Sequence, residues 1–168
     1  MPKIIKNLEA SLIQEARRQV RELGYGALTI RSVAKACGVG VGTVYNYFSS
    51  KDDLLATYML TDWELCIAEI QAVSDYVSTP EPILRCIYDR LCWFTQEHVD
   101  VIRDKDAAAT FSGSFSRYHG LLRSQLVQPL LKFFPDAFTA EFVAEAVLTW
   151  TMAGKSFDEL YGVVSKLL

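Results

Sequence analysis

Residues 29–55 read TIRSVAKACGVGVGTVYNYFSSKDDLL, and this stretch decides how the fold is interpreted. Thr29 stands where the N-cap of a helix belongs, and apolar residues at helical spacing follow it. Gly38 suits the positive φ that ends a helix and begins a sharp turn. The stretch therefore predicts two short helices joined by a turn, followed by a third helix that begins at Lys51.

The second short helix is expected from about Val41 to Phe48, with Val44 and Phe48 buried. Its other face would carry a mixed polar and aromatic set, namely Val41, Gly42, Thr43, Tyr45, Asn46 and Tyr47. An exposed surface of this kind after a tight turn is typical of a helix-turn-helix that enters a groove of double-stranded DNA. Val41 and the methyl group of Thr43 suit a thymine methyl, and Asn46 suits adenine.

The third helix is predicted to begin beside a capping serine. Ser50 suits the N-cap, and Asp53 three residues later makes a variant of the capping box. Lys51 then stands at a helix N-terminus, where backbone N–H groups already favour an anion, so it suits a DNA phosphate. Thr29 and Arg31, at the start of the first short helix, complete the predicted DNA-binding set. Short capped helices around a glycine turn also occur in other all-α domains. DNA binding is favoured here because the turn, the exposed polar and aromatic surface and Lys51 occur together.

Charge is distributed unevenly along the 168 residues. Residues 1–53 carry eight Lys and Arg against five Asp and Glu, a net charge of +3. Residues 54–168 carry nine against fifteen, a net charge of −6, which gives −3 for the whole chain. The positive field of an acidic chain is therefore expected at its N-terminal end, where the DNA-binding pattern lies.

The motif resembles the N-terminal domain of the TetR (tetracycline-repressor-like) family of bacterial transcription regulators. The matching residues run from Leu23-Gly24-Tyr25 through Thr29, Val33-Ala34, Gly38-Val39 and 42–48 to 50–55. Gly40 and Val41 depart from the family pattern, which often has a capping residue and a polar or basic residue there. Glycine also caps a helix, so the departure bears on sequence preference rather than on the fold.

Composition predicts a folded chain without a membrane span. The hydrophobic content of 51% is ample for a core, and no apolar run approaches the roughly 20 residues of a transmembrane helix. The start of the chain mixes charges with apolar residues and lacks a cleavage site, so a helix is expected there instead of a signal peptide, and a cytoplasmic location follows.

Catalytic and metal-binding patterns are missing from the sequence. Cys37, Cys66, Cys86 and Cys92 form no C-x-x-C pair and have no histidine at ligand spacing, so buried free thiols are expected, with a redox sensor as the alternative. No nucleophile elbow, phosphate-binding glycine loop or supported carboxylate pair is present. We therefore expect neither enzyme activity nor a cofactor nor a metal.

The remaining chain is also predicted to be helical, which makes the fold all-α with about nine helices. A DNA-binding domain of three helices (1–50) would precede a helical regulatory and dimerisation domain (51–168). The expected helices cover about 4–23, 51–76, 80–98, a segment ending near Phe111, 115–134, 140–153 and 156–168. Ser112-Gly113-Ser114 would interrupt the pattern, Pro129 would kink the helix that contains it, and Thr139 would cap the next.

The last two helices carry more apolar side chains than a single chain can easily cover. The predicted homodimer interface consists of Phe142, Val143, Ala146, Val147, Trp150, Phe157, Leu160, Tyr161 and Val164. In the TetR family the last two helices form a four-helix dimer interface, and the resemblance implies the same arrangement here. A dimer would bind a palindromic operator.

Aromatic residues between these parts are candidates for the wall of a pocket for an unknown small organic effector. They are Trp63, Tyr88, Trp93, Phe94, Phe111, Phe115 and Tyr118, together with His98 and His119. The competing interpretation is an ordinary core, because aromatic residues at helical spacing are commonly packed inside. Two functions follow: a repressor-type regulator controlled by a small molecule, or a DNA-binding module without a small ligand, controlled by a protein partner.

Overall fold

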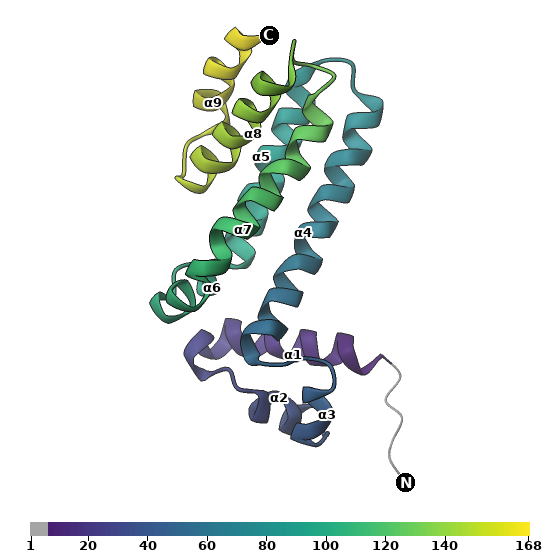
Figure 1. The fold of residues 1–168 in the computed structure, drawn as a ribbon, viewed down its shortest axis with the longest axis vertical. Coiled ribbons are helices and arrows are strands. Elements are labelled where there is room, and N and C mark those ends of the chain that lie inside the picture. The colour runs from purple at the N-terminus through teal and green to yellow at the C-terminus, as the bar shows by residue number, and fades with distance from the viewer. Residues whose placement is uncertain (1–6) are drawn as a thin grey trace. The chain divides into compact units, whose positions relative to one another are not determined.

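The computed structural model describes residues 7–168, apart from the side chains at positions 108 and 110–119. The described chain is helical and contains no strand, so the predicted all-α class is confirmed. Figure 1 labels its helices, which are α1 (Leu8–Leu23), α2 (Ile30–Ala36), α3 (Val41–Tyr45), α4 (Lys51–Tyr76), α5 (Pro80–Glu97), α6 (Val99–Ile102), α7 (Lys105–Leu130), α8 (Ala137–Met152) and α9 (Phe157–Val164). Two 3-10 helices add η1 (Tyr25–Ala27) and η2 (Ser165–Leu167).

Two compact units divide the chain. The first comprises residues up to Thr61 together with His98–Thr110, and the second comprises Asp62–Glu97 and Phe111–Leu168. Helices α4 and α7 therefore contribute residues to both units. The domain boundary expected between residues 50 and 51 stays a prediction, because compactness does not test which part of the chain binds DNA.

The first unit has a core built from the inner faces of its short helices. Leu12 and Ala16 of α1, Val33 and Ala34 of α2, and Val44 of α3 are all almost fully buried. The cap predicted at Thr29 is present, since its hydroxyl accepts a hydrogen bond from Ser32 N (3.0 Å) and Thr29 N donates to Ser32 Oγ (3.1 Å). These contacts fix where α2 begins.

The turn between α2 and α3 has the predicted geometry. Gly38 adopts a φ of 67°, and Val39 N donates to Ala34 O at 3.0 Å. Helix α3 ends at Tyr45, earlier than the predicted Phe48, because Asn46 N and Tyr47 N donate to the carbonyls of Thr43 and Val44 in a tightened last turn. Phe48 is nevertheless buried, as expected.

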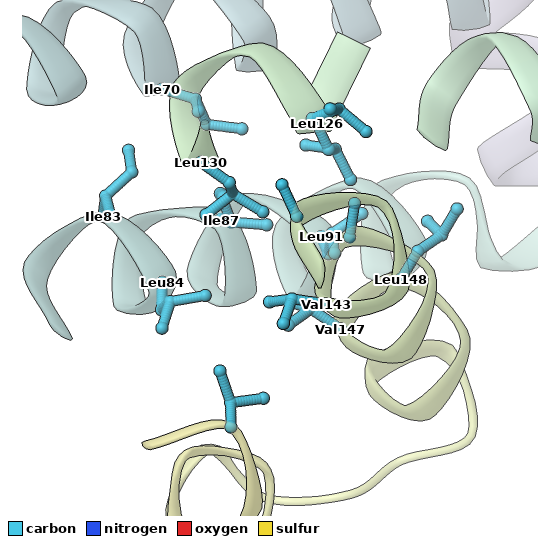
Figure 2. Close-up of a cluster of buried hydrophobic side chains, with 14 of the residues drawn as sticks. Ile70, Ile83, Leu84, Ile87, Leu91, Leu126, Leu130, Val143, Val147 and Leu148 are labelled. Atoms are coloured by element: carbon cyan, nitrogen blue, oxygen red, sulfur yellow. The ribbon is translucent and has the colours of Figure 1, made fainter. Parts of the chain in front are cut away.

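The second unit is held together by aliphatic side chains from α4, α5, α7, α8 and α9. Figure 2 shows Ile83, Ile87 and Leu91 of α5 pointing toward side chains of α4, α7 and α8. Each of these buried aliphatic groups contributes roughly 1.5–3 kcal/mol relative to full exposure. Trp63 of α4 adds a hydrogen bond between helices, in which its Nε1 donates to Gln125 Oε1 of α7 at 2.6 Å.

Helix α7 differs from its prediction at both ends. It continues through 112–114, where a break was expected, because one glycine costs only about 1 kcal/mol in a long helix. The interruption lies at Asp104, whose Oδ1 accepts hydrogen bonds from Asp106 N (2.9 Å) and Ala107 N (3.0 Å). The helix ends at Leu130, one residue after Pro129, so the predicted continuation to Phe134 is wrong.

The caps of the last two helices explain their observed bounds. Asp136, and not the predicted Thr139, caps α8: its Oδ1 accepts from Thr139 N at 2.9 Å, so the helix begins at Ala137. Ser156 and Glu159 form a capping box that starts α9, which ends at Val164 before η2. In the part of the chain described here, no helix has the length and apolar character needed to cross a membrane.

Candidate nucleic-acid interface

Helix α3 presents a mixed aromatic and polar face to solvent. Val44 is fully buried, whereas Tyr45 and Tyr47 are 55% and 46% exposed. Of the other predicted contacts, Val41, Gly42 and Asn46 are exposed and Thr43 is half-buried. These residues of α3 and the turn that follows it are therefore exposed or half-buried, and we call them together the α3 face (residues 41–43 and 45–47).

Packing within the described part of the chain does not require a glycine at position 42. A Cβ atom built at this position would have no neighbouring heavy atom within 4 Å, and the residue does not have a positive φ. The missing side chain therefore leaves open space beside the α3 face, through which the backbone can be approached closely.

Helix α2 contributes two predicted contacts. Arg31 is exposed. Thr29 is also exposed, and its hydroxyl oxygen accepts the capping hydrogen bond from Ser32 N, which leaves the hydroxyl proton available to an external acceptor. Ser32 Oγ in turn donates to Gln19 Oε1 at 2.6 Å, so the start of α2 is tied to α1.

Two neighbouring serines, Ser49 and Ser50, form the cap at the start of α4. Ser50 Oγ accepts from Asp53 N at 3.1 Å, as predicted. The Asp53 carboxylate, however, accepts from the backbone N (2.7 Å) and Oγ (3.0 Å) of Ser49, so the return half of the capping box falls one residue earlier than expected. Lys51 is the first residue of α4 and is followed by Asp52 and Asp53 in the first turn.

Tyr25 is the residue that sequence reasoning missed at this site. It lies in η1, is 3% exposed, and donates a 2.7 Å hydrogen bond from its phenol to Asp52 Oδ1. The Lys51 Nζ atom lies 3.9 Å from the centroid of the Tyr25 ring. From the sequence, Tyr25 is identified only within the Leu23-Gly24-Tyr25 match to the TetR pattern, because no periodicity connects it with a helix that begins 26 residues later.

The arginines of α1 are engaged within the first unit. Arg18 forms ion pairs with Glu15 (2.7 Å) and Glu22, and these carboxylates raise the pKa of its guanidinium. The guanidinium of Arg17 lies 4.6 Å from the centroid of the Tyr58 ring. Arg18 is therefore ion-paired within α1 itself.

The described members of the predicted pocket set lie in different surroundings. Trp63 is buried in the core with the ring of Phe94 edge-on at 5.6 Å, Trp93 is exposed, and Tyr88 donates from its hydroxyl to Lys155 O at 3.1 Å. His98 belongs to the first unit. The predicted members Phe111, Phe115, Tyr118 and His119 have side chains outside the described residues.

A crevice does occur among the described side chains of the second unit. Its volume is about 10 Å³, which is close to the space one water molecule needs. Tyr88 is the one predicted pocket residue in its wall, which consists of Leu84, Tyr88, Val147, Phe157, Leu160, Tyr161 and Val164. The packing of Trp63 and Phe94 favours the core interpretation for those two residues.

Burial narrows the surface available for dimerisation. Phe142 and Trp150 are about half exposed, and Ala146 and Tyr161 are half-buried. The other predicted interface residues are buried within this chain, so they are corrected to core residues: Val143, Val147, Phe157, Leu160 and Val164. Helix α8 is apolar on most sides, so periodicity could not tell its inner face from its outer one. Phe138 of α8 and Val163 of α9 are further exposed apolar residues, outside the predicted set.

The four cysteines are free thiols, as expected. Burial raises the pKa of Cys66 to about 11 and also raises the pKa of Cys37 and Cys86. Cys66 is buried, Cys37 and Cys86 are half-buried and Cys92 is exposed, which corrects the expectation that all four are buried. Among the described residues no three His, Cys, Asp or Glu side chains lie close enough together to hold a metal ion.

Comparison with known proteins identifies the class of this site. Residues 12–58 match the family described as "Bacterial regulatory proteins, tetR family". This range includes α2, α3 and the start of α4. The N-terminal part of the chain therefore belongs to the TetR family of DNA-binding transcription regulators, as its motif predicted.

Similarity to individual proteins extends beyond the motif. The HTH-type transcriptional regulator SAR2658 of Staphylococcus aureus (strain MRSA252) is 23% identical over 141 residues, which cover 84% of this chain and 72% of that protein. The TetR family repressor AlkX from Dietzia, implicated in biodegradation of n-alkanes, superposes with a TM-score of 0.65 at 16% identity over 98% of this chain and 94% of that one.

A third similar protein was solved with a ligand. FadR from Bacillus subtilis, in complex with stearoyl-CoA, has a TM-score of 0.55 and 18% identity, with 94% of each chain covered. At these identities the two structural similarities concern the fold alone. They extend the similarity of fold from the motif to the helical body.

Proposed function

We propose that this chain is a homodimeric repressor that binds a palindromic operator and whose DNA affinity is changed by a small organic effector. The observation that carries the DNA-binding part is the exposed α3 face beside Lys51. Tyrosines as accessible as Tyr45 and Tyr47 gain contacts when a groove covers them. Such a regulator would act in the cytoplasm, where bacterial DNA lies.

The proposed contacts divide into two groups. Lys51 and Tyr47 would bind phosphates and fix the position of the domain, together with Thr29 and Arg31. Val41, Thr43, Tyr45 and Asn46 would face base edges, and Gly42 would allow the backbone close to the groove. Half to two-thirds of protein–DNA hydrogen bonds reach the sugar and phosphate backbone, which is consistent with both groups being present.

The proposed dimer uses the outer side of α8 and the end of α9. Phe138, Phe142 and Trp150 lie at spacings of four and eight residues on α8, and all three are at least half exposed. Val163 is 61% exposed on α9. Exposed apolar side chains that recur on one side of a helix support an interface, because monomers rarely expose large apolar patches. Two identical DNA-binding domains imply a palindrome with half-sites about 34–36 Å apart, or a multiple of that distance.

Control by a small molecule is supported by the similarity to FadR, whose structure contains stearoyl-CoA. For this chain, effector binding would stabilise one dimer geometry and shift the population between forms that bind DNA and forms that do not. Stearoyl-CoA is therefore a reasonable first probe, and native mass spectrometry of gently purified protein would detect a retained organic molecule of another kind.

The second candidate is control by a protein partner. The observation that favours it is the close packing of the described side chains in the second unit, where the crevice measures about 10 Å³. In that case the exposed apolar surface of α8 and α9 would have to serve a different protein as well as, or instead of, a second copy.

Selection of duplexes from a random DNA pool tests the central proposal. The protein should enrich an inverted repeat, and a duplex with one half-site inverted should bind more weakly than the intact repeat. Release of the enriched duplex by stearoyl-CoA would support effector control. Enrichment of no sequence, together with no salt-dependent binding to any duplex, would reject the regulator proposal.

A further inference from the structure

Tyr25 contacts both residues that open α4. Its ring lies 3.9 Å from Lys51 Nζ, measured to the ring centroid, and its hydroxyl donates a 2.7 Å hydrogen bond to Asp52 Oδ1. The side chain is buried in the first unit, so its position is fixed by packing. A rigid aromatic ring therefore lies beneath the one cation of the first turn of α4.

This location is electrostatically unfavourable for a lysine when no anion is bound. The N-terminus of a helix carries a partial positive charge, and a cation there is repelled by it. The face of an aromatic ring attracts an ammonium group through its quadrupole, which compensates part of that repulsion. Without the ring, the flexible Lys51 side chain would be expected to spread over many rotamers in solvent.

We propose that Tyr25 is a positioning residue for DNA binding, whose ring holds the Lys51 ammonium where that group binds a DNA phosphate and whose hydrogen bond to Asp52 holds the ring. The inference rests on the proposed function, because it concerns the phosphate contact of Lys51. An ammonium has three N–H donors, and contact with one aromatic face leaves donors available to phosphate oxygens.

The arrangement would lower the entropy that Lys51 loses on binding. A lysine that is already confined in the free protein has less rotamer freedom to lose when it meets a phosphate. Tyr25 would thus strengthen binding to every DNA sequence without touching a base. Its effect should therefore depend entirely on the presence of Lys51.

Proton NMR of the DNA-free protein tests the ring contact directly. The ε-methylene protons of Lys51 should lie upfield of those of the other lysines because of the Tyr25 ring current, with the signal assigned by its loss in Lys51→Arg. Tyr25→Phe, which loses the hydrogen bond that holds the ring, should reduce the upfield shift, and Tyr25→Leu should remove it. A wild-type Lys51 signal at the ordinary lysine position would overturn the proposal whatever the protein does with DNA.

Titration of a mixed-sequence duplex at several salt concentrations tests the consequence. Tyr25→Leu should weaken binding about two- to tenfold, the range expected for loss of a cation–π contact. Tyr25→Leu/Lys51→Ala should bind no more weakly than Lys51→Ala alone. Tyr76→Leu, a change at the exposed end of α4, is the matched control and should leave binding unchanged.

Two results separate the possible failures. If the losses from Tyr25→Leu and Lys51→Ala multiply, Tyr25 acts through the fold and the positioning role is wrong. If the wild-type protein binds no duplex, the proposed function itself fails, even where the NMR signature is present. Should Tyr25→Leu fail to fold, which a thermal melt would reveal, the wild-type NMR signal and Asp52→Ala remain decisive: Asp52→Ala removes the acceptor and should reduce the upfield shift of Lys51, and an unchanged shift would overturn the role given to the hydrogen bond.

Discussion

The imidazole ring of His98 packs against the phenol ring of Tyr58, with their centroids 4.5 Å apart. His98 is 1% exposed at the junction of α5 and α6. Burial, together with the nearby positive charges of Arg17 and Arg21 on α1, lowers the pKa of His98 to about 4. The first unit thus contains a histidine that is neutral at physiological pH.

The first prediction is that acidification destabilises the protein through His98. The pKa is about 4 in the folded state and about 6.5 in the unfolded chain, so stability is fully present above pH 6.5 and is lost as pH falls toward 4. The complete loss would be about 3 kcal/mol of the free energy of unfolding. Urea midpoints between pH 7.5 and 5 should fall in the wild type and fall less in His98→Phe. Parallel pH profiles for the two proteins would contradict this prediction.

The pH range in that experiment separates His98 from the carboxylates. The pKa values of Glu15, Asp136 and Glu159 are lowered by hydrogen bonds, so their contributions to stability disappear as pH falls through the acidic range. A difference between wild type and His98→Phe that is already present above pH 5 therefore reports on the histidine.

The second prediction separates phosphate contacts from base contacts. Lys51→Ala should weaken binding equally on operator and random DNA and reduce the slope of log K against log salt by roughly one. Thr43→Ala and Asn46→Ala should instead reduce discrimination between the two duplexes, by about 1 to 3 kcal/mol for a good base contact. Fluorescence anisotropy with both duplexes measures each quantity. Equal losses on the two duplexes for all three variants would refute the assignment of base contacts.

The third prediction concerns the oligomeric state. The wild type should be a dimer at micromolar concentration, and Phe142→Glu together with Trp150→Glu should give a folded monomer, because two charges would be buried without partners. Sedimentation equilibrium measures the mass, and circular dichroism checks the fold. Tyr76→Glu, at an aromatic residue that is 91% exposed on α4, is the matched control and should remain dimeric. A dimer that survives the double substitution would place the interface elsewhere.

The fourth prediction is that the thiols do not control the fold. The raised pKa values of Cys37, Cys66 and Cys86 keep these groups protonated at neutral pH, and the thiolate is the reactive form. The melting temperature should therefore be the same with and without dithiothreitol. A large difference would revive the redox-sensor hypothesis, and Cys92→Ser would show whether the exposed thiol is responsible.

Features that depend on neighbouring residues were predicted from the sequence more accurately than features that depend on residues far apart in the chain. Thr29, Gly38 and the bounds of α4 were predicted correctly because caps and turns depend on neighbouring residues. The end of α7 and the cap of α8 were misplaced where several residue types could serve, as with Thr139 and Asp136. Local chemistry therefore predicted the motif better than it predicted the helical body.

Long-range contacts account for what the sequence could not provide. The burial of Val143 and Val147 depends on which side of α8 faces α5, and an apolar helix does not encode that choice in its periodicity. The contact between Tyr25 and Lys51 joins residues 26 positions apart. Such pairings become visible only when the elements are placed in space.

The open space beside Gly42 separates two kinds of selection on helix α3. Because a Cβ atom there would meet nothing within 4 Å, folding alone is indifferent to the residue, and helix propensity would even favour alanine by up to about 1 kcal/mol. Persistence of glycine at this position would therefore reflect a demand made by the operator. A library of substitutions at position 42, sorted once for stability and once for operator binding, should yield two different sets of survivors, which would make this position a route by which the regulator can change its targets without changing its fold.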